Sequence, residues 1–178
     1  MDPLKLLRQK IDAKNLWDAE AELSRNEYLK VGGSTDTKLY YVSEGSLRIF
    51  IIDEEEEHTI RFAYEGNFVA ALDSFISEQP SDLYIQALKK TRVKMIKKRK
   101  YKDFIFSNSE NLKLWHVILE QLVFQQMERE RDLLTSSPSE RYQRVLQRSP
   151  RLFQEIPGRY IASYLRMTPE TFSRIKKS

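Results

Sequence analysis

Residues 161–178, IASYLRMTPETFSRIKKS, decide the fold of this chain because they spell two short helices around a tight turn. Ile161 and Leu165 give the first helix an apolar face. Thr168 suits the N-cap of the second helix and Pro169 its first position, since Thr can accept a free backbone N–H and Pro has none to satisfy. Two such helices with a basic end are typical of a helix-turn-helix that reads DNA.

The outward side of the second predicted helix carries charged and hydrogen-bonding side chains, while its apolar residues recur on the other side. Such groups can reach base edges and phosphates when a helix enters the major groove. We therefore predict that eight residues contact DNA: Arg159, Thr168, Pro169, Glu170, Thr171, Ser173, Arg174 and Lys177. Glu170 and Arg174 are expected to read bases, whereas the hydroxyl groups and the other cations mainly position the helix on the phosphates.

Positive charge is concentrated in the same part of the chain. Residues 138–178 hold nine Lys and Arg against three Asp and Glu, whereas the rest of the chain holds 21 against 23. Neutralisation of phosphates is the common reason to collect Arg141, Arg144 and Arg148 with the basic residues that follow them. A solvated basic face would give the same counts, and an ordinary helical hairpin would give the same periodicity.

The composition excludes several kinds of site. The chain has no cysteine, so disulfides, thiolate metal sites and cysteine nucleophiles are excluded. Its two histidines, His58 and His116, are too few for the metal site of a cupin enzyme, which is an alternative that bound metal would revive. We predict no catalytic residue, no metal, no cofactor and no enzyme activity. No apolar run approaches the about 18 residues of a membrane span, so we expect a cytoplasmic protein without a membrane partner.

Three segments follow one another along the chain. Residues 1–107 open with a short amphipathic helix at about 3–13 and then change to short strands with glycine-containing turns, which predicts a sandwich or barrel. Residues 108–135 carry one long helical pattern, and residues 136–178 form the terminal helical domain. The predicted fold class is α+β, with a jelly-roll or β-roll first.

The long helix has apolar residues on two sides. One line recurs at alternating spacings of three and four and contains Leu112, Trp115, Leu119, Leu122, Gln126 and Arg129. Flanking positions are held by Leu114, Ile118, Val123 and Met127. Attachment to a single domain needs little more than one such side. We therefore predict that the first line meets a second copy of the chain, with Gln126 and Arg129 fixing the register, although burial against its own β-domain is the alternative.

Residues 92–102, RVKMIKKRKYK, are the densest basic stretch of the chain. A second contact with nucleic acid is one interpretation of this stretch. We favour the other, in which a strand edge and loop pair their charges with the acidic residues of the β-domain.

The order of these segments resembles the Crp/Fnr family of bacterial transcription regulators, over essentially the whole chain. The resemblance is carried by Gly45-Ser46-Leu47-Arg48, Gly66-Asn67-Phe68-Val69, Ile85-Gln86-Ala87, SPSERYQRVL at 137–146 and IASYLRMTPETFSRI at 161–175. It implies a β-roll sensor domain, a homodimer formed through the long helix, and double-stranded DNA as the partner at a palindromic site. A small-molecule effector and RNA polymerase are further partners that the resemblance leaves open.

The chain departs from the cyclic-nucleotide-binding members of that family. Their pocket uses an Arg on the cyclic phosphate and a Glu on the ribose hydroxyl. The corresponding effector-pocket positions here are degenerate: Phe68, Ala70, Ala71, Leu72, Ser81 and Asp82. The resemblance therefore implies a β-roll that does not bind cyclic AMP in the usual way.

The DNA reader departs from the family as well. Pro169 stands where the best-known members have Arg, and Arg166 stands at the turn position that is usually Gly. Because the sequence ends at Ser178, we expect the helix-turn-helix to lack the β-wing of longer members. The alternative function is a small-molecule sensor or protein-interaction module that keeps the fold without reading DNA.

Overall fold

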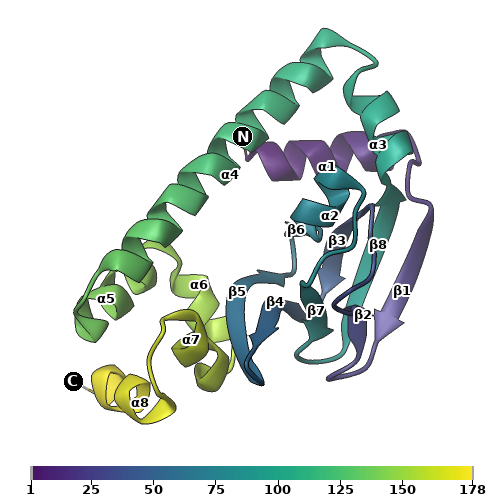
Figure 1. Cartoon of the computed structure of the whole chain (residues 1–178). Coiled ribbons are helices and arrows are strands. Elements are labelled where there is room, and N and C mark those ends of the chain that lie inside the picture. The colour runs from purple at the N-terminus through teal and green to yellow at the C-terminus, as the bar shows by residue number, and fades with distance from the viewer. Residues whose placement is uncertain (1, 178) are drawn as a thin grey trace.

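The computed structural model describes residues 2–177, which form a β-roll, a long helix and a terminal group of helices (Figure 1). Helix α1 (Pro3–Ala13) lies where the periodicity predicts it and begins at Asp2, whose carboxylate accepts the backbone N–H of Leu4 at 2.9 Å. The expectation about a β-wing after Ser178 lies outside the described residues.

Two four-stranded antiparallel sheets make the β-roll. The first sheet has the order β1 (Ala19–Leu23), β8 (Thr91–Lys97), β3 (Lys38–Glu44) and β6 (Phe68–Val69). The second has the order β2 (Tyr28–Lys30), β7 (Tyr84–Ala87), β4 (Ser46–Asp53) and β5 (Glu56–Tyr64). The sandwich expected from the short strands is confirmed.

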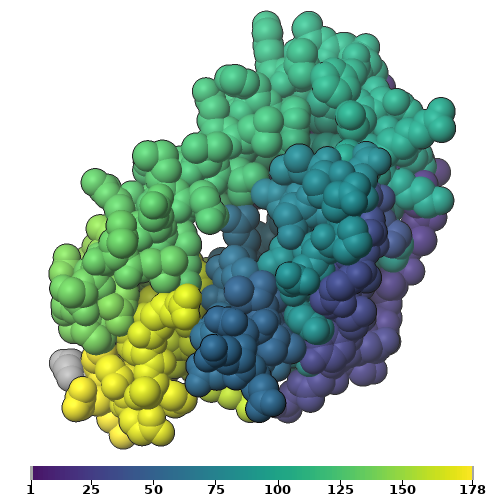
Figure 2. All heavy atoms as spheres, in the orientation of Figure 1, coloured from purple at the N-terminus to yellow at the C-terminus, as the bar shows by residue number. Residues whose placement is uncertain are grey.

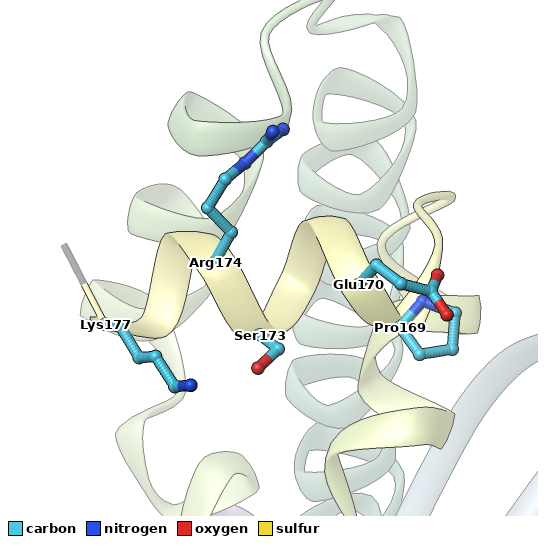
Figure 3. Close-up of a pocket in the computed structure, with 5 residues that line it drawn as sticks. All are labelled: Pro169, Glu170, Ser173, Arg174 and Lys177. Atoms are coloured by element: carbon cyan, nitrogen blue, oxygen red, sulfur yellow. The ribbon is translucent and has the colours of Figure 1, made fainter.

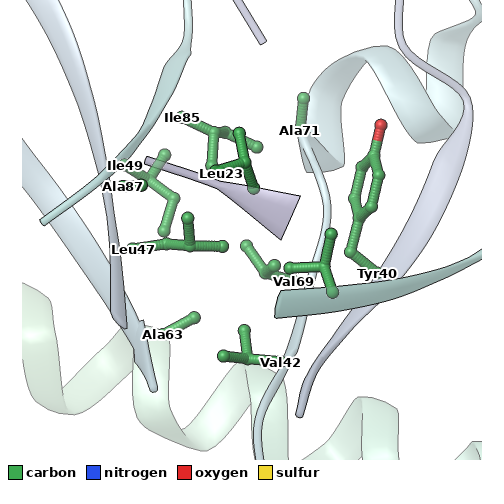
Figure 4. Close-up of a cluster of buried hydrophobic side chains, with 11 residues drawn as sticks. Leu23, Tyr40, Val42, Leu47, Ile49, Ala63, Val69, Ala71, Ile85 and Ala87 are labelled. Carbon is green, nitrogen blue, oxygen red and sulfur yellow. The ribbon is translucent and has the colours of Figure 1, made fainter. Parts of the chain in front are cut away.

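Apolar side chains from both sheets meet in one buried cluster (Figure 4). Leu47, Ile85 and Ala87 come from one sheet, Val42 and Val93 from the other, and none of the five has exposed surface. In β3 the buried residues alternate with less buried ones, as in a half-buried sheet, whereas β4 is buried continuously over Ser46–Phe50 and β7 over Ile85–Ala87. Helix α2 (Leu72–Ser77) lies between β6 and β7 in the chain, in the segment that holds the predicted effector-pocket positions.

A second cluster attaches the helices to the roll. Helix α3 (Lys98–Ile105) and the first half of α4 (Ser109–Leu134) pack with α1 through buried residues such as Leu7, Tyr101, Leu114 and Ile118. The second half of α4 leaves the roll and runs diagonally to the terminal helices (Figure 1). Within the described residues, no helix is both long and apolar enough to span a membrane.

The terminal helices are α5 (Pro138–Arg148), α6 (Pro150–Glu155), α7 (Gly158–Tyr164) and α8 (Pro169–Lys177). Ser137 caps α5 through the backbone N–H of Glu140, as the Ser-Pro sequence predicts. Pro150 ends α5 but also begins α6, a short helix that the sequence pattern did not reveal. The predicted α+β class, with a β-roll followed by helices, is confirmed.

The basic stretch at 92–102 is engaged with acidic side chains of the β-roll. The ion pairs are Arg92 with Glu22 at 2.8 Å, Lys94 with Glu20 at 3.0 Å, Lys98 with Glu78 at 2.7 Å and Lys100 with Asp18 at 3.4 Å. Each of these cations therefore has an acidic neighbour on the β-roll surface. These pairs support the interpretation of a charged strand edge over that of a second nucleic-acid contact.

Gly45 joins β3 to β4 with φ of +93°, and a Cβ there would lie 2.4 Å from Thr91 Oγ1 and 2.5 Å from the Lys90 carbonyl oxygen. Gly66 has φ of +94° with nothing within 4 Å of an added Cβ. We expect both Gly→Ala replacements to cost about 1 kcal/mol for the left-handed backbone. Gly45→Ala should cost about 1–3 kcal/mol more from overpacking. Urea unfolding measures the difference, and equal losses would show that Gly45 is not sterically confined.

Candidate nucleic-acid interface

Helix α8 begins as the sequence predicts. Thr168 Oγ1 accepts the backbone N–H of Thr171 at 3.2 Å, and Pro169 is the first helical residue. Phe172 is 5 % exposed and packs edge-on against the Tyr142 ring, with 5.7 Å between centroids. Gly158 leaves room for it, because a Cβ at that position would lie 2.9 Å from Phe172 Cε1. The buried Phe172 thus fixes which side of α8 faces solvent.

The exposed side of α8 presents most of the predicted DNA-contacting residues. Pro169, Glu170, Ser173, Arg174 and Lys177 line one surface hollow along the helix (Figure 3). This arrangement places an acceptor near the start of the helix and cations toward its end. Base edges and phosphates offer complementary groups to both.

The other three predicted residues have different surroundings. Thr168 and Thr171 bond to each other through their hydroxyl groups at 3.1 Å, at the helix cap. Arg159 lies on α7, where its guanidinium donates to the Tyr160 hydroxyl at 2.7 Å. The structure therefore gathers five of the eight residues on one face and sets Arg159 apart on the preceding helix.

The turn between α7 and α8 is made without glycine. Arg166 adopts the left-handed conformation, with φ of 54°, that its alignment with the family's turn glycine predicts. Its backbone N–H donates to the Ser163 carbonyl at 3.1 Å, and the N–H of Met167 donates to the Ala162 carbonyl at 3.0 Å. A non-glycine residue in this conformation costs about 1 kcal/mol relative to Gly, so other contacts must hold the turn.

Three arginines predicted for phosphate neutralisation are used inside the chain, which corrects that prediction. Arg144 and Arg148 both bind the carboxylate of Asp132, whose side chain has no exposed surface. Arg141 is 9 % exposed and donates only inward, to backbone carbonyls. The positive charge counted in residues 138–178 therefore overstates what the interface offers to DNA.

The terminal helices dock on the β-roll through α7 and β5. The backbone N–H of Thr59 donates to Ser163 Oγ at 3.2 Å, and the rings of Phe62 and Tyr164 lie 5.5 Å apart. Arg166 Nη1 lies 3.2 Å from Nδ1 of His58. Figure 2 shows the terminal helices in contact with the β-roll near β4 and β5. The recognition face of α8 lies outside these contacts.

The six residues predicted for the dimer seam lie on α4 but differ in how exposed they are. Leu112 and Leu119 are 44 % and 37 % exposed, whereas Trp115 and Leu122 are half-buried. The exposed apolar surface continues through residues that the sequence placed on the flanks or left out: Val117, Val123, Phe124 and Met127. The predicted seam is therefore rotated toward these residues.

Gln126 and Arg129, predicted to fix the register between two copies, instead bind within the chain. Arg61 donates to Gln126 Oε1 at 2.9 Å. Arg129 donates to the Tyr164 carbonyl at 2.5 Å, and its guanidinium lies 3.7 Å from the centre of the Tyr164 ring. Burial lowers the pKa of Arg129 from its ordinary value. These contacts hold α4 against β5 and α7, so this side of the helix is not free for a second copy.

The predicted effector-pocket positions are spread over different surroundings. Ala71 is fully buried in the core of the roll, and the Phe68 ring packs 5.2 Å from that of Tyr41. Ala70 packs beside the helical cluster, Leu72 begins α2, Ser81 is buried and Asp82 is exposed. Two arginines of neighbouring strands, Arg61 and Arg92, are engaged elsewhere, with Gln126 and Glu22.

A buried cation that sequence reasoning missed lies beside Ser81. Lys30 Nζ donates to the carbonyl oxygens of Val31, Ser81 and Leu83 at 3.0, 2.8 and 2.7 Å. An ammonium group has three protons, so these carbonyls take all of them. Burial lowers the pKa of Lys30, an effect that nearby carboxylates oppose. No local pattern marks Lys30, because its partners are about 50 residues away in the chain.

Comparison with known proteins extends this picture. The model of the cyclic nucleotide-binding domain family matches residues 20–108, half of the 178 residues. No curated protein matches the chain significantly.

Solved structures match the fold over nearly the whole chain. A mutant of CooA from Carboxydothermus hydrogenoformans has a TM-score of 0.73 and 16 % identity, with 99 % of this chain and 83 % of that chain covered. FixK2 from Bradyrhizobium japonicum has a TM-score of 0.69 and 19 % identity, and the match covers 89 % of this chain and 82 % of the FixK2 chain. The catabolite activator protein of Thermus thermophilus has a TM-score of 0.60 and 20 % identity, covering 99 % and 85 %. Identities this low show a shared fold, whereas the family match rests on the sequence of the β-roll. The chain therefore belongs to the cyclic nucleotide-binding domain family.

Proposed function

We propose that this protein is a homodimeric transcription regulator of the Crp/Fnr type, which reads a palindromic DNA site with α8 in the major groove. The observation that carries the proposal is the polar, solvent-facing side of α8, fixed in place by the buried Phe172. A major groove about 12 Å wide admits one α-helix. The fold shared with CooA, FixK2 and the catabolite activator protein also supports it.

Arg174 and Glu170 are proposed to read bases. Both lie on the exposed side of α8, one turn of helix apart, so they can meet neighbouring base pairs. A guanidinium suits the two acceptors of guanine, and a carboxylate can accept from the amino group of cytosine. Lys177 and Arg159 are proposed to contact phosphates, which positions the helix without selecting a sequence.

A second copy of the chain is the proposed occupant of the exposed apolar face of α4. Val123, Phe124 and Met127 are each about 60 % exposed, an unusual fraction for large apolar side chains of a monomer. Val117, Glu120 and Phe124 line part of a surface hollow into which an apolar side chain of the other copy can pack. Two-fold symmetry would present two α8 helices, as a palindrome with half-sites about one duplex turn apart requires.

The β-roll is proposed to work without cyclic AMP. Lys30 is the buried cation next to Ser81, and its protons are taken by three backbone carbonyls. A cyclic phosphate would have to replace those bonds while facing the exposed carboxylate of Asp82. The effector, where there is one, therefore needs a different chemistry.

The proposal is tested by selecting DNA from a random pool with the purified full-length protein. We expect enrichment of a palindrome and binding to it that weakens with salt, since phosphates contribute to the affinity. Equal binding to selected and random duplexes, or no binding to either, would refute the proposal. The alternative, a small-molecule sensor or protein-interaction module with this fold, would then be preferred.

Arg174→Ala is expected to cost about 1–3 kcal/mol of binding to the selected site and to relax selection at one base pair per half-site. Lys177→Ala should weaken binding to all sequences alike and reduce the salt slope by about 1. The two variants serve as controls for each other in competition gel shifts over a range of salt. Equal losses on specific and random DNA for Arg174→Ala would refute its base-reading role.

Phe124→Glu is expected to turn the dimer into a monomer of 21.2 kDa, because it would bring two like charges together in an apolar contact. Gln147→Glu adds the same charge to an exposed position of α5 and should leave the dimer intact. Sedimentation equilibrium measures both, and we expect the dissociation constant of Phe124→Glu to rise on the order of 100-fold. A dimer unaffected by Phe124→Glu would place the interface elsewhere.

Cyclic AMP at about 1 mM is expected to leave the Tm unchanged, although a site with a Kd of about 10 µM would gain about 2.7 kcal/mol of stability. The reason is that the Lys30 ammonium beside Ser81 already donates its three protons to backbone carbonyls of the chain. Thermal unfolding with and without the nucleotide is the measurement. A saturable rise in Tm would show that the roll rearranges to bind it.

A further inference from the structure

We infer that Arg141 is a positioning residue that sets the angle at which α8 is presented to DNA, by tying the turn of the helix-turn-helix to the end of α4. This inference rests on the proposed function. Arg141 itself lies on α5, away from the exposed side of α8.

The guanidinium of Arg141 joins two segments that are distant in the chain. On one side, its Nε donates to the Leu165 carbonyl at 2.9 Å and its Nη2 to the Arg166 carbonyl at 3.2 Å. On the other side, its Nη1 donates to the carbonyls of Thr135 and Ser136 at 2.6 and 3.2 Å. Leu165 and Arg166 form the turn before α8, while Thr135 and Ser136 form the link from α4 to α5.

The geometry needs an arginine. A guanidinium directs five N–H groups outward in one plane, so it can serve two pairs of acceptors on different sides. The ammonium group of a lysine has three protons on one atom and cannot span both segments. The four carbonyls include groups at helix ends, which lack partners within their own helices. Arg141 supplies those partners in a position that is 9 % exposed.

The bonds from Arg141 to the turn matter because Arg166 holds a left-handed conformation. Arg166 is not a glycine, so its φ of 54° is strained, and without other contacts its backbone would relax to another conformation. The bonds of Arg141 to the carbonyls of Leu165 and Arg166 oppose this change, because they fix the peptide planes on both sides of the Arg166 Cα. Since the same guanidinium holds the α4–α5 link, a shift of that link is passed directly to the turn that orients α8.

The first test compares Arg141→Gln and Arg141→Lys with the control Arg131→Gln, which removes one charge from a side chain on α4 that is 72 % exposed. We expect both Arg141 variants to lose on the order of tenfold in affinity for the selected site. Their affinity for random duplex and their salt slope should match those of the wild type, because no phosphate contact is lost. Retained binding in Arg141→Lys together with a flatter slope in Arg141→Gln would overturn the inference and make Arg141 a phosphate contact.

The second test is rescue at the turn. Glycine adopts positive φ without strain, so Arg166→Gly should restore much of the specific affinity lost in Arg141→Gln. Arg166→Ala removes the same side chain but keeps the strain, and it should restore nothing. Equal effects of the two replacements would show that Arg141 does not act through the turn.

A third measurement decides the role of Arg141 even if the protein binds no specific DNA. The chain has no cysteine, so spin labels can be placed at Glu130→Cys on α4 and Lys176→Cys on α8 alone. Labelled full-length chain is mixed with excess unlabelled chain, so that only distances within one chain are seen. We expect Arg141→Gln to broaden the distance distribution and Arg166→Gly to narrow it again, with circular dichroism confirming that each variant is folded. An unchanged distribution in Arg141→Gln would refute the inference, whereas absence of specific DNA binding by the wild type would refute only the proposed function.

Discussion

The buried carboxylate of Asp132 is the contact on which the arrangement of the terminal helices depends. It has no exposed surface and binds Arg144 and Arg148, with Glu128 as a further acid beside them. Losing both arginines would leave the buried charge of Asp132 uncompensated, a change that costs about 3–5 kcal/mol. The cluster therefore fixes how α5 crosses the end of α4. A further apolar cluster, which includes Tyr142 of α5, Ile161 of α7 and Phe172 of α8, then places α7 and α8 on α5.

The same cluster explains why counting charges is a poor guide to a DNA interface. Asp132 and Glu128 lie outside the terminal segment in which the basic residues were counted, so the count included cations without their anions. Arg141 adds a cation whose donors all face backbone carbonyls. The cations proposed to contact DNA lie on α8 and at Arg159. A regulator of this kind should owe its specificity to a few base contacts more than to a broad basic surface.

Local signals in the sequence predicted α1, the short strands, the long helix α4 and the helices around the final turn, but not the short helices α2, α3 and α6. Long-range contacts were not predictable from such signals. Thr168 and Pro169 mark the start of α8 because capping depends on residues three positions apart. The position of Arg166 in the left-handed region followed from the family resemblance, which places Arg166 where the turn is usually made by Gly. The role of Lys30 was not predicted, because its carbonyl partners Ser81 and Leu83 are more than 50 residues away in the sequence. Gln126 and Arg129 were predicted to meet a second copy, but both bind within the chain, since periodicity gives the faces of a helix without saying what each face meets.

Helix α4 has two faces with different surroundings, and both bear on how α8 is oriented. On the inner face, Gln126 and Arg129 bind β5 and α7 of the same chain. On the outer face, Val123, Phe124 and Met127 lie within one turn of those residues and are exposed. Helix α4 is one continuous helix of 26 residues. A rotation of α4 about its axis, caused by packing on its outer face, would therefore also move Arg129 relative to Tyr164. Because Tyr164 lies in α7, just before the turn that leads into α8, the proposed contact between two copies would be coupled to the orientation of α8.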